Sequence, residues 1–205
     1  TGAELTEKLA VPVPNEHTER LCAKAKEHGI FIQSGTMIEA DPRWPGVAFN
    51  TTCLLGPEGL LYKYRKVNPW IPYEVHASPH DVPGYDEELF PVADTEIGRI
   101  GCAICYDWLF PEATRQLAMN GAEVLVRVSA YMDPWGATEP MDWWTIVNRC
   151  RALENVAFVV ADEKVSQREL RLGRALGDDR EVLDGLAGGD TVVLDPPENL
   201  ADGAH

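Results

Sequence analysis

Positive charge is scarce in this sequence. Its 205 residues include 18 lysines and arginines against 33 aspartates and glutamates, which gives a formal net charge of −15. A strongly acidic surface repels phosphate backbones and anionic lipid headgroups. We therefore expect neither nucleic acid nor a membrane surface as a partner.

Long apolar runs and paired cysteines are also lacking. No run approaches the roughly 20 apolar residues of a membrane-spanning helix, and the first residues lack the charged-then-apolar pattern of a signal segment. The five cysteines are odd in number and scattered along the chain, which is typical of a reducing compartment rather than of a disulfide framework. We expect a cytoplasmic protein, and because residue 1 is threonine rather than methionine, we expect natural sequence upstream of it.

Apolar spacing predicts an α/β fold. A helix over residues 15–28 has Asn15 as a cap and Gly29 as a fitting stop. Runs rich in β-branched and aromatic residues follow, and from Thr95 strand and helix patterns alternate. Such strand–helix–strand units imply sheets covered by helices. The expected strands are 29–37, 46–55, 60–66, 97–105, 124–129 and 156–160, and the further helices are 111–120 and 138–154, the last with Trp143, Ile146, Val147 and Cys150 at helical spacing.

The segment from Val67 to Pro91 shows no period. It is rich in proline, histidine and acidic residues. A loop of this length inside a compact domain usually carries function. We therefore place part of an active-site rim in this segment.

Cys105 ends a predicted buried strand shortly before a helix that begins at Pro111. Ligands of open α/β sheets bind at the carboxyl ends of strands, and a helix N-terminus favours the thiolate form of a nearby thiol. This position suits a nucleophile. A cysteine in a cytosolic domain is more often a small buried apolar residue, so position alone leaves both interpretations open.

Three ordered segments of the chain carry motifs. Residues 105–112 read CYDWLFPE, residues 63–74 read KYRKVNPWIPYE, and residues 121–127 read GAEVLVR with AYMDP at 130–134. The first resembles the nucleophile motif of the nitrilase superfamily of carbon–nitrogen hydrolases, and the second resembles its lysine motif. The lysine, the Pro-Trp pair and the glutamate eight positions after the lysine are similar to the aliphatic amidase and formamidase branch, as is the third segment. The resemblance covers about residues 10–162.

The resemblance implies a site made of Cys105, Lys66 and Glu74. Cys105 would be the nucleophile, Lys66 the cation that holds the developing oxyanion, and Glu74 a carboxylate that orients substrate and lysine. A thiolate can attack an amide carbon, and an ammonium can neutralise the resulting oxyanion. We expect Lys66 at a solvent-facing strand end. The resemblance also implies the backbone N–H of Tyr106 as a second oxyanion donor and Trp70 and Tyr131 as pocket walls.

The implied activity is hydrolysis of a small aliphatic amide to a carboxylic acid and ammonia through a cysteine thioester, without cofactor or metal. His76 and His80 have a metal-ligand spacing only on a helix, and Pro79 disfavours a helix there. Nitrile hydrolysis and N-carbamoyl hydrolysis are alternatives. The alternative from another class is a catalytically silent truncated or fusion protein, or a binding module built on a β-domain.

The family also needs a glutamate as general base. The resemblance places it upstream of Thr1 together with two strands and a helix, whereas Glu4 and Glu7 lie in a different setting. We therefore expect a fragment of the family's four-layer αββα sandwich, whose unpaired sheet edge promotes homo-oligomers. Turnover should then lag behind thiol labelling.

Residues 163–205 differ in composition from the preceding domain. They contain few aromatic residues, a turn-like stretch at 188–190 and a strand-like stretch at 191–194. Residues 164–174, 181–194 and 199–204 resemble the C-terminal β-domain of periplasmic adaptors from tripartite efflux pumps, although a short acidic β-rich tail matches many proteins. We divide the chain into a carbon–nitrogen hydrolase domain, 1–162, and a β-rich, adaptor-like tail, 163–205.

Overall fold

The computed structural model describes residues 8–70, 74, 76–130, 141–160, 171–176 and 179–184. The chain divides into two compact units, Thr1–Ala161 and Asp162–His205. The second unit contains an antiparallel pair of strands, Arg171–Leu176 (β9) and Asp179–Asp184 (β10). The turn-like and strand-like stretches expected at 188–194 lie outside the described residues. No helix of the described part is long and apolar enough to cross a bilayer.

The first sheet of unit 1 is antiparallel. The strand expected over residues 29–37 is divided in two, because the Ser34 hydroxyl accepts the N–H of Cys53 at 2.9 Å and replaces a backbone acceptor. The expected hairpin across residues 56–59 is confirmed, with Gly59 at a φ of 120° that favours glycine. The strands are Ile32–Gln33 (β1), Met37–Ala40 (β2), Ala48–Gly56 (β3) and Gly59–Arg65 (β4), and β3 pairs with the other three.

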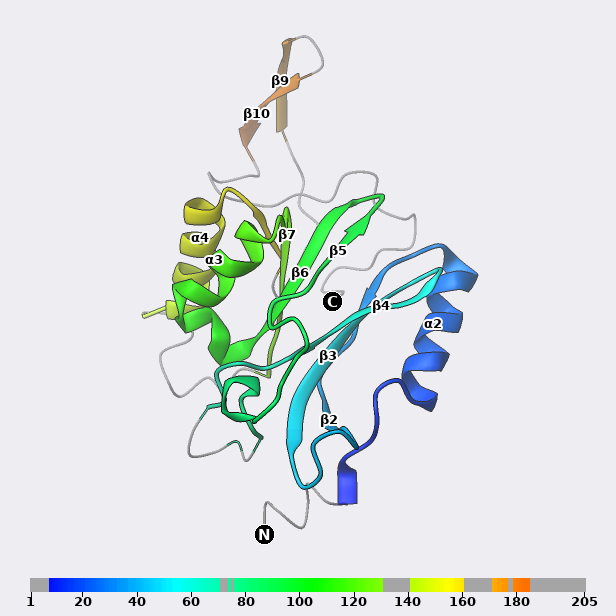
Figure 1. Cartoon of the computed structure of the whole chain (residues 1–205). Helices are drawn as coiled ribbons and strands as arrows, with labels where there is room; N and C mark the ends of the chain where they lie inside the picture. Colours follow the sequence, from blue (N-terminus) through cyan, green and yellow to red (C-terminus); the bar gives the residue numbers. More distant parts are fainter. Residues whose placement is uncertain are drawn as a thin grey trace. The chain divides into compact units, whose positions relative to one another are not determined.

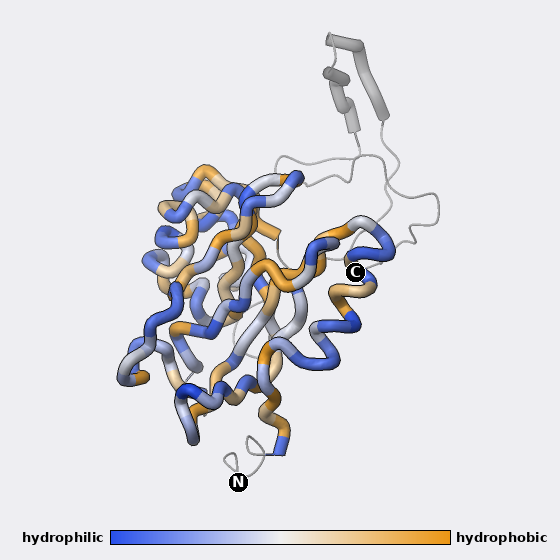
Figure 2. The backbone as a smooth tube through the Cα atoms, turned by 45° about the vertical axis from the view of Figure 1, so that its right-hand side comes forward, coloured by the Kyte–Doolittle hydropathy of each residue, from blue (hydrophilic) through white to orange (hydrophobic). Residues whose placement is uncertain are grey.

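The helix that covers this sheet is Glu16–His28 (α2), as predicted. The Asn15 side chain accepts the N–H groups of His17 and Thr18 at 2.8 and 3.2 Å, and Gly29 ends the helix with a left-handed φ of 63°. The helix contacts β3 and β4 through a narrow face, and most of its length is hydrophilic in Figure 2. The capping residues Asn15 and Gly29 therefore determine where this helix begins and ends.

The second sheet has the order β5-β6-β7-β8, antiparallel between β5 and β6 and parallel thereafter. Apolar residues of β3 and β4 share one core with those of β6 and β7, so the two sheets face each other, with α2 outside one sheet and α3 and α4 outside the other (Figure 1). This arrangement confirms the expected α/β sandwich. The remaining elements are Pro79–Asp81 (η1), Val92–Thr95 (β5), Gly98–Ile104 (β6), Cys105–Leu109 (η2), Pro111–Met119 (α3), Val124–Val128 (β7), Trp143–Asn155 (α4) and Phe158–Val160 (β8).

The buried face of α4 differs from the apolar face expected from its sequence. Trp144, Asn148 and Arg151 are buried, whereas Ile146 and Cys150 are exposed. Asn148 and Arg151 can be buried because each makes hydrogen bonds to polar groups of neighbouring elements. The prediction of the apolar face was therefore wrong for Ile146 and Cys150, whereas Val147 packs against the core.

Candidate active site

Cys105 is the first residue after β6 and opens the short turn η2. Its φ of 48° lies in the left-handed region, which is uncommon for a residue other than glycine. Its side chain is half-buried, whereas Cys102 is fully buried within β6. Burial raises the pKa of Cys102 and raises that of Cys53 to about 12. Cys105 is therefore the one thiol that stands at a strand end within a constrained turn among the described residues.

Lys66 follows β4 and is buried rather than solvent-facing. Only 2% of the residue is exposed, and its Nζ lies 2.5 Å from Oε2 of Glu74. The other carboxylate oxygen of Glu74 accepts from Asn50 Nδ2 at 2.8 Å, and Oε2 also accepts the N–H of Trp70 at 2.5 Å. The expectation of an exposed Lys66 was wrong because Glu74, in the following loop, covers the ammonium.

Hydrogen bonding decides the charge state of Glu74. Burial pushes the pKa of this carboxyl up, but hydrogen bonds from Lys66 and from the Trp70 N–H hold it below its usual value. Lys66 and Glu74 therefore form an ionised pair at neutral pH. Such a pair holds a positive charge in a fixed position beside the loop, and the Glu74 carboxylate balances that charge.

His76 is a neighbour of this pair that sequence analysis considered only as a metal ligand. Burial lowers the pKa of His76, the charge of Glu74 raises it, and the charge of Lys66 lowers it further. Neither ring nitrogen has a hydrogen-bond partner among the described residues. His76 is therefore neutral near pH 7. No group of three or more histidine, cysteine, aspartate or glutamate side chains in the described part of the chain could hold a metal ion.

Asp107 joins the segment that follows β4 to the turn that begins at Cys105. Its Oδ2 accepts from the Tyr64 hydroxyl at 2.8 Å and from the N–H of Ile104 at 3.0 Å. Its Oδ1 accepts the N–H and Nδ2 of Asn68 at 2.7 and 3.0 Å. Burial raises the pKa of Asp107 despite these donors. The side chain thus fixes the position of β4 and its following loop relative to Cys105.

Two buried arginines hold the carbonyl groups of the same turn. Arg127 of β7 donates to the carbonyl oxygen of Cys105 at 3.3 Å, and Arg151 of α4 donates to that of Trp108 at 3.0 Å. Sequence analysis gave neither arginine a role, nor Asp107. The sequence offered a signal for two of them: Arg127 is the lone charge inside the apolar run of residues 124–128, and Asp107 is an acid within the CYDWLFPE motif.

The structure describes two of the three remaining predicted site residues. Trp70 is half-buried and reaches Glu74 through its backbone N–H. Tyr106 is half-buried, with its ring 5.3 Å from that of Phe110 in an edge-on arrangement. Tyr131 lies outside the described residues. The structure thus joins Lys66, Glu74 and Trp70 directly and links their segment to Cys105 through Asp107.

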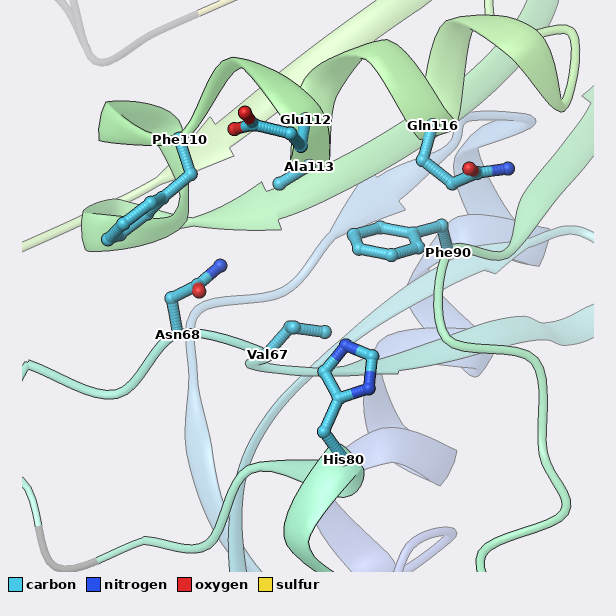
Figure 3. A pocket seen from close by; sticks show the side chains of 8 residues that line it. All are labelled: Val67, Asn68, His80, Phe90, Phe110, Glu112, Ala113 and Gln116. Carbon is cyan, nitrogen blue, oxygen red and sulfur yellow. The ribbon is translucent and has the colours of Figure 1, made fainter.

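A hollow of about 260 Å³ lies beside this site. Figure 3 shows Val67 and His80 from the loop facing Ala113 and Gln116 of α3 across it. Glu112, in the first turn of α3, is exposed and also lines the hollow. The lining contains neither Cys105 nor Lys66, so the hollow is separate from the candidate active site.

The fold and these motifs identify the class of protein. The family model for carbon–nitrogen hydrolases matches residues 3–203, and the chain belongs to this family. Similar proteins include formamidases of Bacillus cereus strain B4264 and Bacillus thuringiensis strain Al Hakam, each 32% identical over 162 residues. The match takes in 76% of this chain and 43% of each formamidase. The chain thus spans less than half the length of these curated relatives.

Solved structures agree with this assignment. Nit3 of Saccharomyces cerevisiae, a member of branch 10 of the nitrilase superfamily, gives a TM-score of 0.63 at 27% identity over 78% of this chain and 56% of that chain. The NitFhit protein of C. elegans gives 0.58 at 29% identity, with 78% and 38% covered. An amidase from Nesterenkonia sp. gives 0.55 at 26% identity, with 70% and 50% covered. The expected nitrilase-superfamily fold is confirmed.

Proposed function

We propose that this chain carries the Cys-Lys-Glu site of an enzyme that hydrolyses a small aliphatic amide. The observation that carries the proposal is the buried Lys66–Glu74 pair, 2.5 Å apart, tied through Asp107 to the turn that begins at Cys105. A fixed ammonium near a strand-end thiol suits an intermediate whose charge develops on oxygen. The formamidases and the amidase among similar proteins support a small amide as substrate.

The proposed reaction has two stages. The Cys105 thiolate adds to the amide carbon, and the resulting oxyanion is held by Lys66 and the N–H of Tyr106. The C–N bond breaks, the amine takes a proton and leaves as ammonia, and a thioester remains. Water then adds, the C–S bond breaks, and the acid leaves. A general-base glutamate is needed to move these protons.

Glu74 acts on the lysine in this scheme. Its carboxylate is held by three donors, so it fixes the direction of the Lys66 ammonium. The resemblance assigns the walls of the substrate pocket to Trp70 and Tyr131, of which the structure describes Trp70. This assignment separates a charged oxyanion clamp from an aromatic binding surface.

Ammonia release tests the proposal. Formamide and acetamide are the amide substrates. Acetonitrile tests for nitrile hydrolysis, and N-carbamoylglycine tests for N-carbamoyl hydrolysis. Peptide mass spectrometry of the same samples looks for a thioester on Cys105. The Cys105→Ala variant is the negative control, and Cys150→Ser, which changes an exposed cysteine of α4, is the matched positive control.

The outcomes discriminate between the candidate functions. Ammonia from the amides that disappears in Cys105→Ala and persists in Cys150→Ser supports the proposal, whereas faster release from the nitrile or the carbamoyl compound favours that alternative. Ammonia release that survives Cys105→Ala excludes the proposed nucleophile. If neither ammonia nor a thioester is detected, the result supports the catalytically silent or binding-module alternative.

Partners and location follow from the same proposal. We expect a homo-oligomer, because β8 lies at the edge of its sheet in the described part of the chain, with Phe158 and Val160 exposed. The cytoplasmic location stays a prediction from the scattered, odd-numbered cysteines. Light scattering after size exclusion tests the oligomer, and a clean monomer would contradict it. The adaptor likeness of residues 163–205 stays a prediction, and the family match extends to residue 203.

A further inference from the structure

Arg127 is a buried guanidinium beside the nucleophile turn. It lies in β7 opposite Ala103 of β6, and 3% of the residue is exposed. One amino group donates to Asn148 Oδ1 at 2.7 Å and the other to the Cys105 carbonyl at 3.3 Å, while Nε is buried without a partner. The guanidinium carbon lies 3.6 Å from the ring centroid of Trp144.

Arg127 forms no ion pair with any carboxylate of the described residues. Burial, together with the neighbouring charge of Arg151, lowers its pKa to about 10, although a negative charge on Cys105 raises it. A buried cation normally needs an anionic partner, because its desolvation is only partly offset by neutral hydrogen bonds and aromatic faces. Cys105, whose carbonyl oxygen Arg127 holds, would supply such an anion when its side chain is a thiolate.

The other cations around this turn are paired with carboxylates or exposed. Arg151 of α4 pairs with Glu154 at 2.8 Å, and Lys66 pairs with Glu74. Asp107, within the turn, is surrounded by donors from Tyr64, Asn68 and Ile104. Glu112 and Arg115 of α3 face solvent. Among the described residues around this turn, Arg127 is thus the buried cation that has no carboxylate partner.

We propose that Arg127 is a positioning residue that acts through Cys105: it anchors the Cys105 carbonyl and leaves its own charge free to stabilise the thiolate and the anionic tetrahedral intermediate. The inference rests on the proposed function, in which Cys105 is the nucleophile. A purely structural role, in which Arg127 only joins β7, α4 and the turn, makes the opposite prediction when the guanidinium is given a carboxylate.

The substitution Asn148→Asp supplies that carboxylate with almost no change in shape, 2.7 Å from the guanidinium. We expect the new ion pair to neutralise the field of Arg127 and to shift the midpoint of Cys105 alkylation with pH upward by about one unit. This corresponds to about tenfold slower labelling below the midpoint. The melting temperature should stay equal or rise, since Arg127 is held more tightly.

Labelling of the parent chain and of variants with limiting iodoacetamide, mapped by peptide mass spectrometry across pH, provides the measurement. Asn120→Asp is the matched control, because it makes the same chemical change at an exposed residue after α3 and should leave the midpoint in place. An unchanged midpoint in Asn148→Asp with equal or higher stability would overturn the proposal and leave Arg127 a structural role.

A second pair of variants covers the case in which Asn148→Asp does not fold. Arg127→Gln removes the charge and keeps a donor, whereas Arg127→Lys keeps the charge and loses the planar fork. A midpoint raised only in Arg127→Gln supports the proposal, and equal midpoints in both variants contradict it. Alkylation needs no amide turnover, so preferential labelling of another cysteine in the parent would instead count against the proposed function.

Discussion

Arg65 and Arg127 are two buried arginines in opposite sheets with opposite surroundings. Both are almost fully buried, with 2% and 3% exposed, and both lie against aromatic rings, Phe49 at 4.3 Å and Trp144 at 3.6 Å. Arg65 makes hydrogen-bonded ion pairs with three carboxylates, whereas Arg127 has none among the described residues. The same side chain therefore serves two purposes in one fold.

The pKa values express this difference. Burial alone would lower the pKa of Arg65, but hydrogen bonding and charge attraction from Glu39 raise it above its usual value. The pKa of Arg127 falls to about 10 because burial is not compensated in that way. The difference supports our proposal that Arg65 stabilises the resting fold around Lys63 and Lys66, whereas the charge of Arg127 acts on Cys105.

Breaking the Arg65 cluster should have the largest effect on stability. Glu39→Gln removes the carboxylate that lies 2.6 Å from Arg65 and 2.8 Å from Lys63. Removal of one partner of a buried ion pair costs about 3–5 kcal/mol. Urea unfolding should show this loss, while the pH midpoint of Cys105 labelling in the folded fraction stays in place. A shifted midpoint would show that the two regions are not independent.

Lys66→Met should have the largest effect on turnover. Loss of the oxyanion cation lowers kcat by at least about 10²-fold, and stability falls as well because the half-buried Glu74 loses its counter-ion. Lys63→Met is the matched control: Lys63 is also an ion-paired lysine, bound to Glu39 at 2.8 Å, but on β4. It should lose stability and keep turnover. Equal turnover losses in the two variants would mean that Lys66 acts only through folding.

Acid should lower the stability of the region around Arg65 and Lys66, because the carboxylates paired with them become protonated. Glu39 and Glu74 have lowered pKa values, although burial pushes both up, because hydrogen bonds from Arg65 and Lys66 respectively outweigh that effect. Their stabilisation is complete above the ordinary glutamate pKa of about 4.3 and is lost as pH falls through the lowered folded-state values. Urea unfolding between pH 6 and 2.5 should therefore show falling stability, with a shallower fall in Glu74→Gln. An unchanged slope in that variant would contradict the ionised pair.

The smallest effect is expected at the aromatic face of Arg127. Trp144→Phe keeps an aromatic ring but weakens the cation–π contact, so stability should fall by about 0.5–1 kcal/mol. A double-mutant cycle with Arg127→Lys isolates the coupling from the loss of packing. Zero coupling would indicate that Trp144 contributes packing alone.

Local signals allowed much of the fold to be predicted from the sequence. Asn15 and Gly29 fixed the ends of α2 through their own backbone and side-chain geometry. The strand tip at Cys105 and the helix start at Pro111 followed from apolar patterning and the preference of proline for a first turn. These features depend on neighbours close in the chain.

The errors came from contacts between distant segments. Lys66 is buried because Asn50, on another strand, helps to hold Glu74 over it. Asn148 and Arg151 face inward on α4 because they meet Arg127 and the Trp108 carbonyl. Apolar periodicity does not record such partners, so it favours the wrong helix face when buried polar groups are satisfied at long range.

The central claim, that Cys105 is the nucleophile, is tested most directly by finding which of the five thiols reacts first with brief, limiting iodoacetamide in the folded chain. The test is stringent because Cys150 is the more exposed thiol and would react first if access alone decided. We predict that Cys105 is labelled first and that denaturation in urea abolishes the preference. Preferential labelling of Cys22, Cys53 or Cys150 in the folded protein would contradict the assignment.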